Sequence, residues 1–436
     1  MSYSTNISGG IQQPREYDIV LLGATGFTGR FSAVHLSQAA KGRKWAISGR
    51  SSKKLTKLAG DLGCGVQGGP DTIPVDFTEE SLGALARRTK CLIATVGPFP
   101  ILGVLPFKAC AENGTHYVDV NGETSSVLDM IRAYHSVAKS TGAVMIPSCG
   151  VGSLPADILT YLMVQSIREK FNTPTSAVLF SIHKSRVQAS GGTLNSLVTS
   201  ASLSGLKDML ASRKPWELSP VQPTTDRRTQ SREVTKETIN RLGLGTLGFG
   251  MSTTHDEALV QRTWGLFQQG ESSGLGILSY GPNFNFKSVQ RYQSRFHGWA
   301  FLALVWAMTI LPAVFPPLRW LVRYFVPPGT GPTEEERRKN FLEYRGVAIA
   351  DFDEHSLSGL PPTTSQMGVQ ATMRYDGDSY VFSGVLAAEV AMALLDLTTE
   401  TAAHKLGGGV LTAAVLGQPL VDRLIKVGTK LDVSEL

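Results

Sequence analysis

The stretch that most limits what this chain can fold into is an apolar segment that runs directly into three glycines. Residues 17–22 (YDIVLL) have the composition of a buried strand, Gly23, Gly26 and Gly29 follow, and an amphipathic helix pattern comes next. Glycines between a strand and a helix let the backbone approach a ligand, and the free N–H groups of the helix attract a phosphate, although the GxxGxxG spacing also fits an ordinary tight turn. The predicted phosphate loop consists of Gly23, Ala24, Thr25, Gly26, Phe27, Thr28 and Gly29.

The same alternation of strand and helix continues to about residue 152. Further apolar segments that we interpret as strands lie at 45–50, 71–77, 91–99, 115–123 and 143–150, with helical patterns between them. Strands that are apolar along their whole length and are joined by single helices form a parallel sheet with both faces covered. The fold class that we predict is therefore α/β, with an N-terminal Rossmann-type parallel sheet.

The length of the chain, 436 residues, exceeds what one hydrophobic core supports, so we expect two domains. After residue 152 the pattern becomes mixed, with a polar stretch at 211–250 that predicts loops and an apolar helix at 379–397 that is suited to pack back on the first domain. The expected division is a flexible tail at 1–16, a dinucleotide-binding domain at 17–152, a mixed α/β substrate domain at 153–375 and C-terminal helices that return to the first domain at 376–436.

The end of the second predicted strand indicates which nucleotide binds. In a sheet of this kind this position faces the adenosine ribose, where an acid selects NAD and an arginine suits the 2′-phosphate of NADP. The sequence SGRSSKK at 48–54 contains no acid. We therefore predict NADPH as the cofactor, with Gly49, Arg50 and Ser51 at the ribose phosphate, although the two lysines also fit a solvated helix start.

Three other strand ends supply further candidates for cofactor contacts. Asp76 follows the third strand and suits the adenine amino group, or else it serves as a charge at the start of the next helix. The turn after the fourth strand contains Val96, Gly97 and Pro98. Its glycine keeps side chains away from the nicotinamide, or else the segment is a simple turn. Glu123 follows the fifth strand, where it fits a hydrogen bond on the nicotinamide side or a helix cap.

Charge, cysteines and histidines restrict the classes of partner. Lysine plus arginine exceed the acids by 42 − 36 = 6, which is too small an excess to indicate nucleic acid as a partner. The four cysteines form no CxxC pair and the first 16 residues lack the apolar core of a signal peptide, so we expect a reduced, cytoplasmic protein. The eight histidines show no spacing typical of zinc sites, and we predict no metal.

An uncharged apolar segment at 298–318 stands apart from the rest of the second domain. It has the length to cross a bilayer, but Pro312, Pro316 and Pro317 interrupt it, which argues against a simple spanning helix. Arginines flank it on both sides, and its tryptophans suit the depth of lipid headgroups. We expect this segment to dip into one membrane leaflet, with a buried wall of the second domain, an oligomer contact or a true span as alternatives.

Seven segments occur along the chain in the order LLGATGFTGR, WAISGRSSKKL, VGPF, KACAENGTHYVDVNGE, GSLPADI, SGGTLNS and GGGVLTAA followed by LVDRL. Together they resemble the saccharopine dehydrogenase-like oxidoreductases, a family that includes trans-acting enoyl reductases, which serve polyketide synthases. The resemblance covers about residues 17–427 and implies a Rossmann domain, NADPH and a second domain over the substrate. It also implies contact between the apolar segment and lipid, because some relatives are linked to lipid droplets.

The chain departs from the family pattern at four polar positions near the expected nicotinamide pocket. Phe99 stands where the family has a tyrosine, Leu102 where it has a second tyrosine and Val104 where it has a glutamate. Gly152, in the segment GVGSLPAD, replaces an aspartate. All four differences remove polarity, which predicts an apolar ligand and leaves no obvious proton donor. The predicted substrate pocket consists of Phe99, Leu102, Val104, Gly152 and Gly192.

The side chains that remain polar near this pocket include Ser148 and Asp157. The candidates for catalysis are Cys149, Ser153 and Thr193, although packing is the simpler role for Cys149. Reduction of a carbon–carbon double bond ranks above reduction of an imine, because water can supply the proton at carbon.

The predicted function is that of an NADPH-dependent, trans-acting enoyl reductase in secondary metabolism. Its substrate would be a lipophilic polyketide-type or carrier-bound molecule, and its partner a polyketide synthase or a carrier protein. A redox-inactive cyclase or scaffold protein in a biosynthetic pathway and a saccharopine-like imine reductase are the alternatives.

Overall fold

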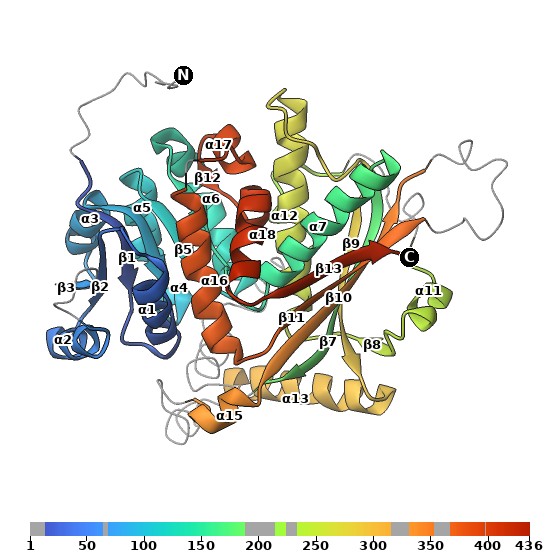
Figure 1. Ribbon diagram of the computed structural model, residues 1–436, viewed down its shortest axis with the longest axis horizontal. Helices are drawn as coiled ribbons and strands as arrows, with labels where there is room; N and C mark the ends of the chain where they lie inside the picture. Colours follow the sequence, from blue (N-terminus) through green and yellow to red (C-terminus); the bar gives the residue numbers. More distant parts are fainter. Residues whose placement is uncertain are drawn as a thin grey trace.

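Two β-sheets stand on opposite sides of the molecule, with helices α7 (Leu154–Phe171), α12 (Thr253–Ser272) and α16 (Ser379–Leu394) between them (Figure 1). The computed structural model describes residues 14–63, 69–187, 214–223, 233–314, 331–352, 367–396 and 398–436. One sheet is parallel and the other is mixed, so the predicted α/β fold class is confirmed.

In the described part of the chain, the first sheet contains seven parallel strands. In spatial order they are β12 (Gly409–Val410), β6 (Val144–Ile146), β5 (His116–Asp119), β4 (Thr89–Ala94), β1 (Tyr17–Leu22), β2 (Trp45–Gly49) and β3 (Asp71–Pro74). Strand β1 has β2 on one side and β4 on the other, so the strand order reverses there. In open sheets of this kind, ligands bind outside the carboxyl ends of the strands at such a switch point.

The side chains of β1 alternate between two hydrophobic cores, one on each face of the sheet. The helices around this sheet are α1 (Phe27–Ala39), α2 (Ser52–Asp61), α3 (Glu79–Arg87), α4 (Phe99–Leu102), α5 (Val104–Glu112) and α6 (Thr124–Thr141). Ile19 and Leu21 belong to the core that includes side chains of α1 and α16, whereas Val20 and Leu22 belong to the core that includes α3 and α5. Both faces exclude water, which explains why the strand is apolar at every position.

Strands β3, β4, β5 and β6 end several residues earlier than the sequence predicts. The residues beyond each strand end continue as loops across the carboxyl edge of the sheet. The loops at 95–98, 120–123 and 147–153 therefore follow three neighbouring strands, and the glycine loop follows β1 beside them. This edge gathers almost all of the predicted site residues.

The second sheet is mixed. In spatial order its strands are β13 (Lys430–Glu435), β11 (Gly368–Tyr375), β10 (Phe341–Ala350), β7 (Thr175–Arg186), β9 (Asn285–Tyr292) and β8 (Thr246–Gly248). Only the pairing of β7 with β9 is parallel among these described strands. The stretch 211–250, which the sequence predicts as loops, contains β8 and the short helix α11 (Lys236–Arg241), so that expectation is wrong in part.

The segment after residue 376 contributes to both sheets. Its elements besides α16 are α17 (Ala402–Leu406), η3 (Ala413–Leu416), α18 (Gly417–Lys426) and the strands β12 and β13. Helix α16 packs so closely along α1 that the Ser32 hydroxyl donates to the backbone oxygen of Gly384 at 3.1 Å. Strand β12 pairs with β6 and strand β13 pairs with β11, which the sequence did not reveal.

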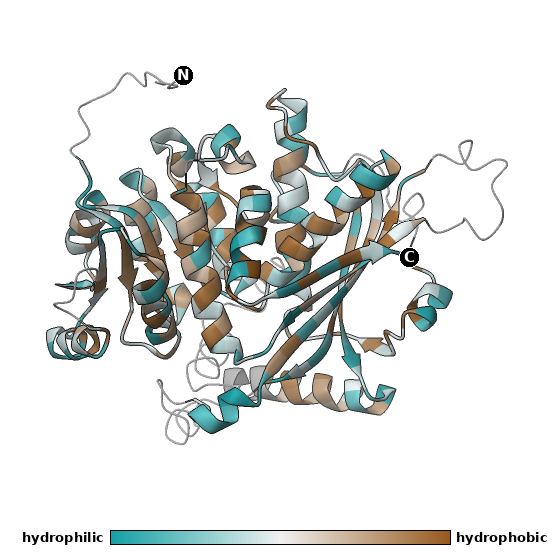
Figure 2. Ribbon diagram, viewed as in Figure 1, coloured by the Kyte–Doolittle hydropathy of each residue, from teal (hydrophilic) through white to brown (hydrophobic). Residues whose placement is uncertain are grey.

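Helix α13 (Arg295–Val314) contains most of the apolar segment and lies beside β8 and β9, near α15 (Glu334–Arg338) (Figure 1). Figure 2 shows apolar colours along much of α13. The helix continues past Pro312, where we expected an interruption, and Pro316 and Pro317 lie outside the described residues. No helix in the described ranges is both long and apolar enough to cross a membrane.

Candidate functional site

The glycine loop between β1 and α1 has a shape that side chains would disrupt. Gly23 has a φ of +86°, and a Cβ at this position would lie 2.8 Å from Cγ1 of Val96. A Cβ on Gly29 would lie 2.7 Å from Oγ1 of Thr95. The backbone of the loop therefore packs directly against the residues that follow β4, across the switch point of the sheet.

The N-terminus of α1 faces this loop with its backbone amides uncovered by a side-chain cap. Gly26 is the N-cap residue, no described side chain caps the helix, and its first turn contains no acid. Such a helix end has unsatisfied N–H groups and a positive dipole end. A backbone cradle of this kind fits the pyrophosphate of a dinucleotide.

Arg50 lies directly beyond the end of β2 and is exposed. Ser51 is the N-cap of α2 and accepts a hydrogen bond from the amide of Lys54 at 3.4 Å. No acidic side chain in the described ranges forms an ion pair with Arg50, so its guanidinium is available to an anion at the edge of the adjacent strand. This arrangement fits a ribose 2′-phosphate.

Asp76 is exposed in the loop that follows β3. Helix α3 is capped by Thr78, whose hydroxyl accepts from the amide of Ser81 at 3.2 Å, and its first turn already contains Glu79 and Glu80. The helix therefore has its cap and its N-terminal charge without Asp76, so α3 does not require this carboxylate.

The nicotinamide side of the edge begins after β4. Val96 is buried, and Gly97 and Pro98 form the turn into α4. Glu123 is half-buried at the N-cap position of α6, but its side chain makes no capping hydrogen bond there. The structure thus brings the predicted cofactor residues together along one edge of the sheet.

The predicted substrate-pocket residues are only partly gathered. Phe99 is buried in α4, whereas Leu102 and Val104 pack against the hydrophobic core that includes α3 and α5. A Cβ on Gly152 would meet its nearest neighbour, Cβ of Ser252, only at 4.0 Å, so this backbone is open. Gly192 lies outside the described residues.

Two of the three predicted catalytic candidates, Cys149 and Ser153, contact backbone oxygens of their own segment, at the end of β6 and in the loop after it. Burial raises the pKa of the Cys149 thiol well above its usual range, and Sγ lies 3.2 Å from the backbone oxygen of Ile146. The Ser153 hydroxyl donates to the backbone oxygen of Ser148 at 2.5 Å. Thr193 lies outside the described residues.

Asp157 is a buried junction between three elements. Its carboxylate accepts from the Thr263 hydroxyl of α12 at 2.5 Å and from the amide of Ala414 in η3 at 2.9 Å. Burial raises the pKa of Asp157 to about 7. These contacts indicate a role in holding α7, α12 and η3 together.

Sequence reasoning missed a buried polar cluster around His255, in the first turn of α12. Its Nε2 lies 3.2 Å from Oγ of Ser148, and its Nδ1 lies 3.0 Å from Oγ1 of Thr124. Ser148 has a φ of 65°, and its amide donates to Oδ1 of Asp119 at 2.8 Å. Burial lowers the pKa of His255 to about 4 and raises the pKa of Asp119 to about 6. No sequence signal linked residues that lie more than a hundred positions apart.

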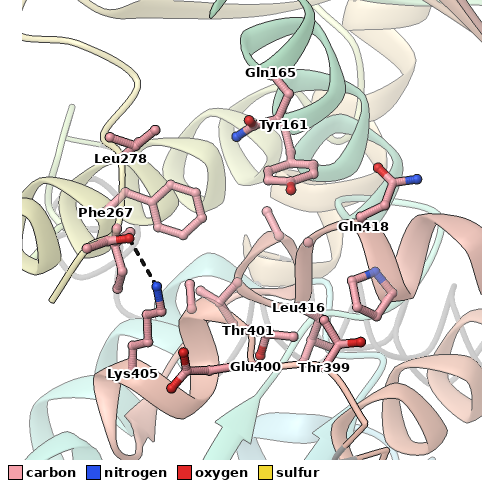
Figure 3. A pocket seen from close by; sticks show the side chains of 17 residues that line it. Tyr161, Gln165, Phe267, Leu278, Thr399, Glu400, Thr401, Lys405, Leu416 and Gln418 are labelled. Atoms are coloured by element: carbon pink, nitrogen blue, oxygen red, sulfur yellow. Dashed lines mark hydrogen bonds between the residues drawn. The ribbon is translucent and has the colours of Figure 1, made fainter. Parts of the chain in front are cut away.

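A separate cavity of about 310 Å³ lies between α7, α12 and the C-terminal elements α17, η3 and α18. Tyr161, Gln165, Phe267 and Lys405 point into it, and Lys405 donates to the backbone oxygen of Gly276 (Figure 3). None of the described residues predicted for the cofactor or the substrate lines this cavity.

Comparison with protein families matches residues 19–146 to the NADP-binding domain of saccharopine dehydrogenase. The matched range runs from β1 to β6. It contains every residue that the sequence predicts to bind the cofactor.

Comparison with curated proteins finds relatives that match over almost their full length. A Mycobacterium tuberculosis protein with a provisional designation as a trans-acting enoyl reductase is 30% identical over 454 residues, which cover 97% of this chain and 99% of that protein. The trans-acting enoyl reductase of Mycobacterium leprae is 28% identical over 436 residues, with the same coverage. Among solved structures, a short-chain dehydrogenase/reductase from Mycobacterium ulcerans aligns with 30% of this chain and 66% of its own, at 16% identity and a TM-score of 0.25.

Proposed function

This chain belongs to the saccharopine dehydrogenase-like oxidoreductases, the family that includes the trans-acting enoyl reductases, and from this membership we propose that it reduces a carbon–carbon double bond in a lipophilic, carrier-bound substrate. It is an NADP-dependent oxidoreductase. The proposal rests on a phosphate cradle free of side chains and on an exposed arginine at the next strand end that has no acidic partner among the described residues. Reductase relatives match the chain over almost its full length.

In this proposal, different residues at the carboxyl edge of the first sheet bind different parts of NADPH. Backbone amides at the start of α1 would bind the pyrophosphate, and Arg50 would bind the 2′-phosphate of the adenosine ribose. Glu123 and the turn at Gly97 and Pro98 would border the nicotinamide. When bound, NADPH supplies a hydride to an electrophilic carbon of the substrate.

An enoyl thioester is the substrate class that suits this site best. Hydride addition at its β-carbon leaves negative charge on the thioester oxygen, which backbone N–H groups can stabilise, and the α-carbon then takes a proton that water can supply. Apolar residues stand at the family's polar positions, among them Phe99, which is buried beside the nicotinamide turn. An apolar wall of this kind favours an acyl chain over a charged imine substrate.

The test is a reaction of the purified protein with NADPH and a medium-chain α,β-unsaturated acyl thioester. We expect NADPH oxidation that matches, mole for mole, a product heavier by two hydrogens in mass spectrometry. The saturated thioester serves as the control and should leave NADPH unoxidised. A product of unchanged mass, or NADPH binding without oxidation by any enoyl thioester, would contradict the proposal.

The exposed face of α13 fits contact with a membrane surface, where a lipophilic substrate would be found. Phe296 is 76% exposed, Trp299 is 71% exposed, and Leu304 and Trp306 are also exposed. Tryptophans and apolar side chains on one helix, next to arginines, are typical of interfacial membrane contacts. The proposed contact is with anionic lipid headgroups and the upper part of the acyl layer.

Flotation with phosphatidylcholine–phosphatidylserine vesicles tests this contact. We expect the doubly substituted variant Trp299→Ser and Trp306→Ser to lose most of the vesicle-bound fraction. The matched control is Ile425→Ser, which removes a 49% exposed apolar side chain from α18 and should bind vesicles as the natural sequence does. Equal binding by all three proteins, or no binding by any, would exclude the membrane contact.

A further inference from the structure

The first turn of α12 carries two adjacent buried polar side chains that reach toward different sheets. His255 is 4% exposed and Asp256 is 1% exposed. Helix α12 runs between the two sheets (Figure 1). Buried polar groups are costly unless they are hydrogen-bonded, so two in succession indicate that both sets of contacts matter.

His255 reaches the nucleotide-binding sheet. Its two ring nitrogens contact the hydroxyls of Ser148 at 3.2 Å and Thr124 at 3.0 Å. Ser148 lies in the loop after β6, and Thr124 is the first residue of α6, after the loop that follows β5. The imidazole therefore joins the two loops that border the nicotinamide half of a dinucleotide in a sheet of this order.

Asp256 reaches the second sheet. Its Oδ2 accepts from the Ser288 hydroxyl of β9 at 2.8 Å and from the Ser252 hydroxyl at 2.9 Å. The next residue, Glu257, accepts from the amide of Ser288 at 3.2 Å. The start of α12 is thus fixed to an inner strand of the second sheet by two consecutive carboxyl groups.

The backbone conformation of Ser148 indicates that the His255 imidazole holds the loop after β6 in place. A serine with a φ of 65° lies in the left-handed region, which non-glycine residues adopt only where the surroundings enforce it. The amide of Ser148 is held by Asp119, and its hydroxyl faces His255. Loss of the imidazole would leave the buried Ser148 hydroxyl and the half-buried Thr124 hydroxyl without this partner and would relax the loop.

We propose that His255 is a positioning residue for the nicotinamide half of the cofactor, because it locks the loops after β5 and β6 together and ties them, through the adjacent Asp256, to the sheet of the substrate domain. The inference rests on the proposed function only for the location of the site. His255 itself takes no part in the transfer of hydride or proton.

Variants of His255 separate the two hydrogen bonds. Glutamine places a polar nitrogen or oxygen near the position of Nε2 and can keep the contact with Ser148, asparagine does so near Nδ1 and can keep the contact with Thr124, and phenylalanine keeps the volume without either bond. The readout is the Kd for NADPH, measured by fluorescence in the absence of substrate, together with urea unfolding to establish that each variant is folded.

We expect His255→Phe to raise the Kd for NADPH about tenfold, with smaller increases for His255→Gln and His255→Asn. Ser148→Ala should also raise the Kd for NADPH. The double variant Ser148→Ala with His255→Phe should have a Kd only slightly above that of His255→Phe alone, because both changes remove the same contact. If His255→Phe does not fold, Ser148→Ala carries the test alone. A Kd unchanged within about twofold in the folded variants would overturn the proposal.

His135→Gln is the matched control. This histidine also has a pKa lowered by burial to about 4, but it contacts Arg262 and the amide of Val410, at β12. We expect this variant to lose stability while its Kd for NADPH stays within about twofold of the natural value. An increase as large as that of His255→Phe would overturn the proposal, since the effect would then be general destabilisation. Because no substrate is used, failure of enoyl reduction would not affect this comparison.

Ser288→Ala tests the connection to the second sheet. It removes the hydroxyl that Asp256 holds on β9 and leaves His255 and its partners unchanged. We expect the Kd for NADPH to rise about threefold. An unchanged Kd would confine the positioning role to the nucleotide-binding sheet and would overturn the connection between the sheets.

Discussion

At the scale of the residue, the proposed site assigns the choice between NADPH and NADH to one side chain, the guanidinium of Arg50. Arg50 is exposed at the carboxyl end of β2, where an acid would select the unphosphorylated ribose. The lysines in the same stretch are part of the exposed surface of α2. We therefore expect the residue at position 50 to control discrimination between NADPH and NADH.

Arg50→Ala should raise the Kd for NADPH by about tenfold to a hundredfold, because a charge-assisted contact with the 2′-phosphate is lost. The Kd for NADH should change by less than about threefold. Isothermal titration with both nucleotides checks this, and Lys53→Ala is the control. Equal effects of Arg50→Ala on the two nucleotides would contradict the assignment of Arg50.

Asp157 gives a residue-scale prediction on pH. Its pKa in the folded protein is about 7, above the ordinary value of 3.8, so the folded state holds this proton more tightly than the unfolded state does. The resulting stabilisation is fully present below pH 3.8 and is lost as the pH rises toward 7. The free energy of unfolding in urea should therefore fall more between pH 5 and pH 8, roughly one unit beyond the folded pKa, in the natural protein than in Asp157→Asn. Parallel pH profiles would contradict this.

At the scale of the element, the strand, glycine loop and helix at residues 17–39 were readable from the sequence. An apolar strand, closely spaced glycines and helix periodicity are local properties of a sequence. The short strands β12 and β13 were not readable, because two residues, Gly409 and Val410, carry no periodicity and β13 depends on pairing with β11. The contact of His255 with Ser148 was missed for the same reason, since tertiary packing alone creates it.

Gly29→Ala tests the glycine loop as an element. The added Cβ would meet Oγ1 of Thr95 and the backbone of Gly23 and Ala24. We expect the free energy of unfolding to fall by about 1–3 kcal/mol and NADPH affinity to fall at least about tenfold. The control is Gly60→Ala in α2, where a Cβ meets nothing within 4 Å and should raise stability by about 0.5–1 kcal/mol. Unimpaired NADPH binding by Gly29→Ala would exclude this loop as the phosphate site.

At the scale of the whole molecule, the two sheets cannot be separated by one cut in the sequence. The C-terminal segment supplies β12 and the covering helix α16 to the first sheet and β13 to the second. Helix α16 is buried along almost its whole length, which requires the first sheet on one side and its neighbours on the other. Domain boundaries that are drawn from the order of segments along the sequence therefore miss that the residues after 376 belong to both sheets.

A fragment of residues 14–152 should accordingly fail to bind NADPH, although it contains every predicted cofactor residue. Without α16, the apolar faces of α1 and β4 would be open to water. Circular dichroism should show loss of cooperative unfolding, and co-expression with a fragment of residues 153–436 should restore it. A fragment that binds NADPH tightly on its own would contradict this account.

The position of β12 and β13 also bears on how the protein matures during translation. A nascent chain shorter than 410 residues cannot complete the first sheet, and one shorter than 435 residues cannot complete the second. Strand β6 is synthesised more than 250 residues before its edge partner β12, so this edge of the apolar sheet stays exposed until the C-terminal segment has been made. Ribosome-bound intermediates of this protein are therefore expected clients for holding chaperones.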